Sequence, residues 1–143
     1  CGGRRLAQAW AGGARTVHGI HVHGFPNCLI MNNTQAGFTA NYPHLLDEQA
    51  KHIAHILKAA SDRGWTRLEA TAQGESDWVR QCVEKARDAG DFLRNCTPGY
   101  YNNEGRVGER SAQDGFYGGG SIEYFRILGQ WRAQGDLAGL DVR

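Results

Sequence analysis

Residues 23–49 read His-Gly-Phe-Pro-Asn-Cys-Leu-Ile-Met-Asn-Asn-Thr-Gln-Ala-Gly-Phe-Thr-Ala-Asn-Tyr-Pro-His-Leu-Leu-Asp-Glu-Gln. The apolar run at 28–31 predicts a short strand, and the polar loop after it leads into a long amphipathic segment. In open α/β sheets, ligands bind at the carboxyl ends of strands, beside helix N-termini. Free amides and the helix dipole at such an end favour an anionic or electron-rich group. We therefore expect the loop at 32–39 to face a ligand.

The amphipathic segment predicts a helix over residues 45–63, because its apolar residues recur at helical spacing. Asn41 is a candidate N-cap, and Pro43 is well tolerated close to the first turn of a helix. Gly64 follows the last apolar residue and predicts the end of the helix. This is the clearest element of the sequence.

Two further helices are predicted on the same grounds. One begins at Glu75 or Ser76 and ends at Gly90, and the other spans residues 121–133 and ends at Gly135. The expected apolar face of the last helix consists of Ile122, Phe125, Leu128 and Trp131.

Alternation of apolar residues predicts two more strands, over 16–23 and over 65–71, the second with Leu68 and Ala70 inward. Residues 1–15 predict a turn or short ribbon. Residues 91–120 hold few periodic signals and two glycine-rich patches, which is typical of a functional or flexible segment. The tail after Gly135 predicts no element.

The composition of the 143-residue chain is typical of one ordinary domain with many turns, since 20 residues are glycine. The formal net charge is +1 and no basic stripe stands out, so nucleic acid is not an expected partner. The chain shows neither a long apolar run nor a signal-peptide pattern, so we expect no membrane association. The four cysteines lack C-x-x-C spacing, which favours free thiols in a cytoplasmic protein.

Three blocks of sequence, in this order, resemble the C-terminal part of flavin-dependent Baeyer–Villiger monooxygenases. The blocks are His23–Asn27 with Leu46–Gln49, Cys96–Gly105, and Tyr117–Gly120 followed by Ile122–Phe125 and Trp131–Arg132. The resemblance implies an α/β fold: the C-terminal portion of a flavoprotein with two dinucleotide-binding domains, with short strands, three helices and a long Gly-rich loop. Members of the family are several times longer, and this chain begins with Cys rather than Met, so we expect most of the enzyme to lie upstream.

The resemblance also implies what the complete protein does. It would use FAD and NADPH to insert one oxygen atom from O2 into a ketone, giving an ester or lactone. Residues 1–64 would form the strand-loop-helix end of the FAD-binding domain, and residues 65–143 a helical and loop extension that covers the active site. No G-x-G-x-x-G turn and no residue in the context of the family's catalytic Arg occurs in the chain, so we expect this piece to be inactive without the rest of the parent chain.

Two groups of site residues follow from the resemblance. The cofactor-binding group lies beside the flavin ring, at the loop and at the start of the next helix: Asn33, Thr34, Gln35, Asn41 and Tyr42. The second group, Phe38, Thr39 and Ala40, lines the ketone pocket. Asn33-Thr34 stands where relatives have Gly-Pro; because Asn tolerates positive φ, the turn is expected to survive. The alternatives are an ordinary strand-to-helix loop, and a Phe38 that fills the core.

The histidines and Cys96 are interpreted as residues without a catalytic or metal-binding role. The six histidines show no zinc spacing completed by Cys or carboxylate, so we expect surface or loop positions rather than a metal site: His18, His21, His23, His44, His52 and His55. Cys96 has no activating base nearby in sequence, which favours a structural turn with Tyr100 and Tyr101 packed on the body. The glycine run 118–120 is interpreted as a mobile segment over the active site, or as an inert loop.

Two other classes of function remain open from the sequence. One is a related flavin monooxygenase that oxygenates nitrogen or sulfur, with the same C-terminal architecture. The other is a non-catalytic interaction module, favoured only by the lack of nucleotide-binding turns in this chain.

Overall fold

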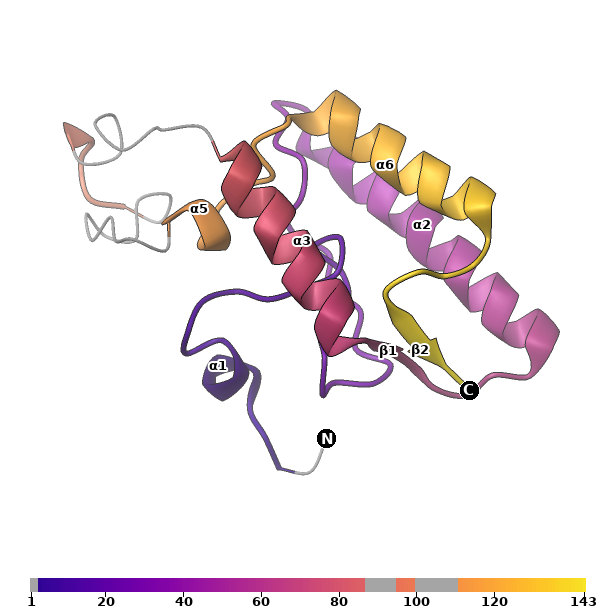
Figure 1. Ribbon diagram of the computed structural model, residues 1–143. Helices are drawn as coiled ribbons and strands as arrows, with labels where there is room; N and C mark the ends of the chain where they lie inside the picture. Colours follow the sequence, from indigo (N-terminus) through magenta and orange to yellow (C-terminus); the bar gives the residue numbers. More distant parts are fainter. Residues whose placement is uncertain (1–2, 87–94, 100–110) are drawn as a thin grey trace.

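The computed structural model describes residues 3–86, 95–99 and 111–143. Helices and two short strands make up the described part, in keeping with the α/β prediction: α1 (Leu6–Ala9), α2 (Tyr42–Arg63), β1 (Leu68–Ala70), α3 (Ala72–Lys85), α5 (Ser111–Asp114), α6 (Ser121–Gln134) and β2 (Leu140–Val142). The long helices α2 and α6 lie side by side, and the pair β1–β2 lies near one end of them (Figure 1).

Helix α2 confirms the clearest prediction from the sequence. The Asn41 side chain accepts a hydrogen bond from the His44 amide at 3.2 Å, and Pro43 lies in the first turn. Gly64 ends the helix in the left-handed conformation, with φ of 68°. Its buried residues follow helical spacing and form one stripe: Leu45, Gln49, His52, Ile56 and Ala60.

Helix α3 begins three residues earlier than the sequence predicts. The Thr71 hydroxyl accepts a hydrogen bond from the Gly74 amide at 2.9 Å and so caps the helix. The helix also ends earlier than predicted, at Lys85, because Ala86 has ψ of 130° and leaves the helical conformation; Gly90 itself lies outside the described residues.

Helix α6 ends at the left-handed Gly135, as predicted, but its buried face is rotated from the expected one. Ile122 is 85 % exposed, whereas Tyr124 is fully buried. Tyr124 can lie inside because its hydroxyl donates a hydrogen bond to the His18 carbonyl oxygen at 2.8 Å. The spacing of apolar residues could not predict that Tyr124, and not Ile122, would lie on the buried face of the helix.

The two strands form one antiparallel pair, with Leu68 opposite Val142 and Ala70 opposite Leu140. The strand predicted over 65–71 is therefore present as the shorter β1. The expectation that the tail after Gly135 forms no element is wrong, because β2 forms there. Three residues are too few for a periodicity to stand out in sequence.

The predicted strands over 16–23 and 28–31 are not formed. Residues 17–21 instead make a tight turn, in which His18 and Gly19 have φ of 57° and 72°. Two left-handed residues in succession reverse the chain before a ladder can form, and only isolated bridges remain, from Val17 to His21 and from His21 to Leu29. At the N-terminus, where a turn or short ribbon was expected, Leu6–Ala9 forms a single helical turn, α1, and not a ribbon.

The core has two clusters that join segments distant in sequence. One lies where α2, α3 and α6 meet residues 36 and 117, and contains Ala36, Leu45, Trp78, Cys82, Tyr117, Tyr124 and Leu128. The other lies under the strand pair and contains Ile56, Ala60, Leu68, Trp131 and Leu137. None of the helices in the described part of the chain is long and apolar enough to cross a membrane.

Candidate functional site

The loop that precedes α2 is folded by its own polar groups. The Asn32 side chain accepts a hydrogen bond from the Thr34 amide at 2.6 Å, and the Asn32 carbonyl accepts one from the Gln49 side chain of α2 at 2.9 Å. Closer to the helix, the Asn41 amide donates to the Thr39 hydroxyl at 3.2 Å. These bonds fix the direction in which the chain enters α2.

The positive φ of this loop lies at Gln35, with φ of 55°, and not at Asn33 as expected from the sequence. The tolerance of asparagine for this conformation is therefore not what preserves the turn. Asn33 contributes through its carbonyl oxygen, which accepts a hydrogen bond from the Ala36 amide at 3.2 Å. The side chains of Asn33 and Thr34 are half-buried.

Gln35 anchors the loop to the body of the molecule and is fully buried. Its side-chain oxygen accepts a hydrogen bond from the Thr16 hydroxyl at 2.6 Å, and its side-chain nitrogen donates to the carbonyls of Ala14 and Gln113 at 2.7 and 2.9 Å. The Gln35 carbonyl accepts from the Trp78 indole at 3.0 Å. In this arrangement the Gln35 side chain positions the loop, and other atoms of the loop face outward.

The outward side of the loop is partly apolar. Phe38 is 55 % exposed and its ring centroid lies 4.4 Å from that of Phe116. Phe38 therefore does not fill the core of this part of the protein. Thr39 is half-buried, and Ala40, Asn41 and Tyr42 are exposed. The residues predicted for the pocket and for the start of the helix thus lie together on an accessible surface.

The N-terminus of α2 keeps its positive dipole end free of local acid. The first turn contains no acidic residue. Asp47 lies in the following turn and pairs with Lys51 at 2.7 Å, and this hydrogen bond holds the pKa of the Asp47 carboxyl below its usual value. An anionic or electron-rich group beside Asn41 and Tyr42 would therefore meet a favourable field.

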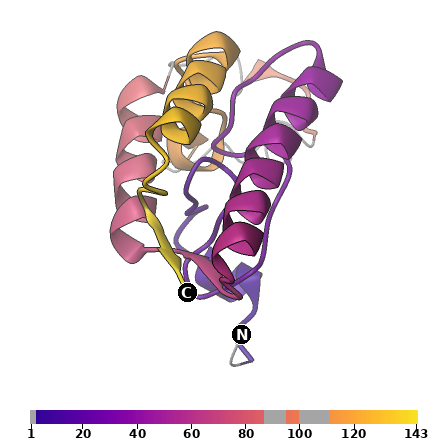
Figure 2. The same cartoon turned by 90° about the vertical axis from the view of Figure 1, so that its right-hand side faces the viewer.

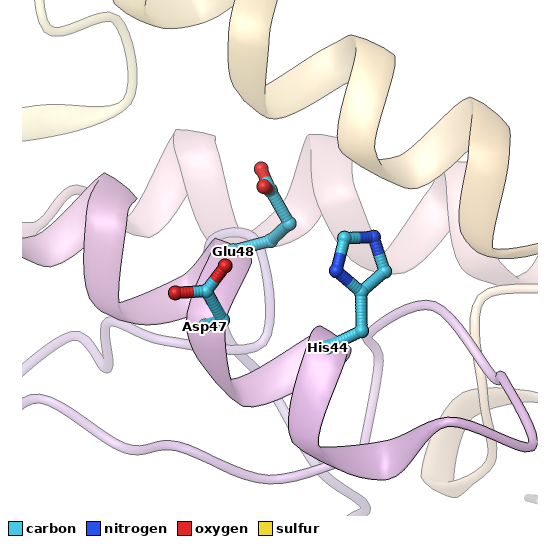
Figure 3. A group of neighbouring side chains, drawn as sticks. All are labelled: His44, Asp47 and Glu48. Atoms are coloured by element: carbon cyan, nitrogen blue, oxygen red, sulfur yellow. The ribbon is translucent and has the colours of Figure 1, made fainter.

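One cluster of the described residues has the spacing of metal ligands: His44, Asp47 and Glu48, whose ligand atoms lie within 4.8 Å of one another (Figure 3). The Lys51 ammonium lies 2.7 Å from Asp47 and 2.8 Å from Glu48, and the Arg132 guanidinium lies 3.8 Å from Glu48. Because these cations already neutralise both carboxylates, the cluster supports a salt-bridge network on α2 better than a metal centre.

The expectation that most of the histidines lie at the surface or in loops fails for His52, which is buried in a helix, whereas His18 and His21 lie in a loop but are buried there. His18, His21 and His52 are 7 %, 2 % and 0 % exposed, while His23 and His44 are exposed. Burial lowers the pKa of His18 to about 3, of His21 to about 4 and of His52 to about 2. The position of His52 could have been found, because it falls on the apolar stripe of α2.

Two buried carboxylates were missed by the sequence analysis, and they hold the first of the three sequence blocks in place. Glu75 accepts a hydrogen bond from the His23 amide at 2.6 Å, and Glu69 accepts one from the Gly24 amide at 2.7 Å. Glu69 also pairs with Arg67, and Glu75 with Arg15 at 3.5 Å. Their signal in the sequence is weak, because isolated glutamates in a strand and in a helix normally point to solvent.

The glycine run before α6 is closely packed, which favours the inert loop over the mobile segment, although a mobile cover stays a prediction. An added Cβ on Gly118 would overlap the backbone of Lys85, and one on Gly119 would lie 2.5 Å from the Tyr117 ring. Residues 111–114 form α5 in a segment expected to be irregular. Cys96 is half-buried, and Tyr100 and Tyr101 lie outside the described residues.

Comparison with known proteins covers almost the whole chain. No protein-family model matches. The chain is 50 % identical over 142 residues to pentalenolactone D synthase of Streptomyces arenae, which is 99 % of this chain and 24 % of that protein. It is 38 % identical to Baeyer-Villiger monooxygenase ATR8 of Stachybotrys chlorohalonatus, over 98 % of this chain and 23 % of that protein. The chain spans about a quarter of the length of these relatives.

Solved structures show the same fold. A polycyclic ketone monooxygenase from Thermothelomyces thermophila superimposes with a TM-score of 0.86 and 33 % identity, over 99 % of this chain and 23 % of that one. A steroid monooxygenase bound to NADP superimposes with a TM-score of 0.78 and 27 % identity, over 99 % of this chain and 25 % of that one. The arrangement of α2, α3, α6 and the strand pair is therefore shared with proteins of known structure.

Proposed function

We propose, from the premise that this chain corresponds to the C-terminal part of the Baeyer–Villiger monooxygenases, that the complete protein inserts one oxygen atom of O2 into a ketone to give an ester or lactone. FAD and NADPH, when bound, would supply the redox chemistry. Relatives named as FAD-binding monooxygenases and a neighbour bound to NADP support this choice of cofactors. No catalytic residue is assigned within the described residues, so the chain would act by binding and positioning.

The main support for the role proposed for this chain is the accessible surface that the loop and the N-terminus of α2 form. Asn41 and Tyr42 lie at a helix N-terminus whose first turn contains no acidic residue, and the half-buried Asn33 and Thr34 belong to the loop that leads to it, which suits the electron-rich edge of a flavin ring. Gln35 would serve the cofactor indirectly, by holding the loop in this position. These residues fit the cofactor that the resemblance implies.

The first test is a bulky residue in the loop. Thr34→Trp in the complete protein is expected to lower FAD affinity by about tenfold, because a half-buried threonine leaves no room for an indole beside a bound ring. The measurement is the fraction of protein that retains FAD after dilution. Thr66→Trp is the control, since Thr66 is exposed at a distant site. Equal FAD retention by the two variants would contradict the loop assignment.

The second test concerns the ketone pocket, for which Phe38, Thr39 and Ala40 are proposed. Phe38→Ala is expected to shift the ratio of kcat/KM between a bulky and a small ketone by about tenfold, because an exposed ring shapes the pocket without supporting the core. NADPH oxidation without ketone should change much less. Ile122→Ala, at another exposed apolar residue, is the control and should alter neither quantity. If both quantities change equally in Phe38→Ala, the residue does not line the pocket.

Two further parts of the interpretation are proposals about organisation. Residues 1–64 would close the FAD-binding domain and residues 65–143 would cover the active site; the second core cluster, which joins α2 to the strand pair and α6, supports close packing of the two parts. A cytoplasmic location is supported by free thiols at Cys28 and Cys82.

A further inference from the structure

We propose that His18, His21 and His52 form an acid-sensitive lock, which holds residues 14–37 between helices α2 and α3 while the three imidazoles are neutral and releases this segment when they take up protons. The inference concerns the stability of this arrangement and does not depend on which reaction the complete protein catalyses. We refer to the three residues below as the histidine lock.

The lock lies where the tight turn at 17–21 meets three helices. The His18 ring is in edge-to-face contact with Trp78 of α3 at 4.9 Å between centroids, and with Trp131 of α6 at 5.7 Å. His52 of α2 lies 5.5 Å from His18 and 4.7 Å from Trp131. The segment that carries His18 runs through the space between α2 and α3, so these ring contacts join it to both (Figure 2).

Among the described residues, four buried ring nitrogens of the histidine lock have no hydrogen-bond acceptor for an additional proton. Nδ1 of His18, Nε2 of His21 and both ring nitrogens of His52 are buried and have no hydrogen-bond partner in the part of the chain that the structure describes. A neutral imidazole carries one N–H, and a protonated one carries two. Each proton taken up would therefore add a charge and a donor to an apolar, aromatic environment.

The groups that face the lock oppose a positive charge. On His52 the effects that lower the pKa are burial first, then His18, His21, Arg132 of α6 and His55 of α2. The residue of α3 at the lock is the uncharged Trp78, and the Tyr124 hydroxyl of α6 stays neutral because burial raises its pKa. Glu48, also on α2, is paired with Lys51 and lies 3.8 Å from Arg132.

The direction of the pH effect follows from these values. The folded pKa of each lock histidine lies below the unfolded value of 6.5, so the stabilisation is complete above about pH 6.5 and is lost as the pH falls toward the folded values of about 4, 3 and 2. One such histidine changes the opening equilibrium by about tenfold per pH unit, and three change it by up to about a thousandfold per unit near pH 5.

Release of the turn would also release the loop in front of α2. Gln35 is bonded to Thr16 and Ala14, which immediately precede the turn, and the Gly19 amide donates to the Thr16 hydroxyl at 2.9 Å. When the turn moves, the partners that hold Gln35 move with it. The lock thereby couples protonation in the core to the position of residues 32–37.

The experiment is hydrogen exchange by mass spectrometry on the complete protein between pH 7 and pH 4.5. Exchange at the imidazole carbon should be at least about tenfold slower for the lock histidines than for the exposed His23 and His44 at pH 7. Backbone amides of residues 14–37, corrected for the intrinsic effect of pH, should lose protection with a slope of two to three protons. In the variant His52→Phe this slope should fall by about one proton, that is, tenfold per pH unit.

His44→Phe is the matched control, because it makes the same substitution at an exposed position of the same helix. The control should keep the slope of the unsubstituted protein. The proposal is overturned if His18, His21 and His52 titrate near pH 6.5 while residues 14–37 stay protected, or if His52→Phe and His44→Phe have the same slope. If His52→Phe does not fold, the imidazole exchange of the unsubstituted protein decides between these outcomes.

Discussion

Gln35→Leu is expected to lower the free energy of unfolding by about 3 kcal/mol, although leucine has nearly the same size and is more apolar. The substitution leaves the buried Thr16 O–H without its acceptor and the part-buried Gln113 carbonyl without the Gln35 donor. The Ala14 carbonyl keeps one bond, from the Gln113 side chain at 2.8 Å. A buried donor left without an acceptor costs about 1–3 kcal/mol, and the loss at the Gln113 carbonyl adds to it, which together outweigh the apolar gain. The measurement is the midpoint and slope of urea unfolding.

Gln130→Leu provides the matched control for this loss. Gln130 is exposed on α6 and only accepts a hydrogen bond from Arg126 at 3.3 Å, so its replacement should change the free energy of unfolding by less than about 0.5 kcal/mol. Gln35→Glu tests hydrogen bonding apart from side-chain shape. A carboxylate has nearly the same shape as the amide, but it cannot donate to the carbonyl oxygens of Ala14 and Gln113. A small loss in Gln35→Leu, equal to that of Gln130→Leu, would show that the bonds around Gln35 contribute little.

The left-handed conformation of Gln35 is a feature of the site that could not be predicted from the sequence. The sequence correctly indicates a turn with one residue at positive φ before α2, but assigns that conformation to Asn33. Asparagine tolerates the left-handed region better than glutamine does. The three side-chain bonds of Gln35 to residues 14, 16 and 113 override this local preference. Contacts over such distances leave no local pattern, so the sequence cannot predict them.

Helices α2 and α6 could be predicted because their signals are local. In α2 a capping Asn41, an apolar stripe and a terminal Gly64 all lie within one continuous segment. The turn at 17–21 could not be predicted, because local hydrogen bonds close it but the left-handed His18 also depends on tertiary contacts with Trp78 and Trp131, which leave no local pattern. Strand β2 was missed for a related reason, since its pairing partner is a segment about 70 residues away.

The assignment of Phe38, Thr39 and Ala40 to a ketone pocket comes from the family resemblance and not from a local sequence pattern. Nothing in the residue types distinguishes an aromatic that fills a core from one that faces a ligand, and both interpretations followed from the sequence. The structure decides against the core, because Phe38 is 55 % exposed and contacts Phe116. Its role in a ketone pocket remains a prediction, which the substrate ratios of Phe38→Ala would test.

Gly118→Ala is expected to destabilise the protein by about 3 kcal/mol or more, even though it adds a single methyl group. The added Cβ would overlap the carbonyl oxygen of Lys85 and lie 2.6 Å from its carbonyl carbon and 2.9 Å from the Cα of Ala86. These are backbone atoms at the end of α3, so no side chain can rotate to make room. Relief requires a shift of α3 relative to the segment before α6, which would disturb the contact of Trp78 with Tyr117.

Gly12→Ala makes the same chemical change at a position where an added Cβ meets no atom within 4 Å and where φ is not positive. Its effect should lie within about 0.5 kcal/mol of zero, or slightly stabilise the protein by restricting the unfolded chain. Urea unfolding followed by tryptophan fluorescence suits the comparison, because Trp78 lies in the cluster that would be disturbed. If Gly118→Ala unfolds at the same urea concentration as Gly12→Ala, the end of α3 has room for a methyl group. The glycine at 118 would then be dispensable for packing, and a mobile cover would again be the better interpretation of the glycine run.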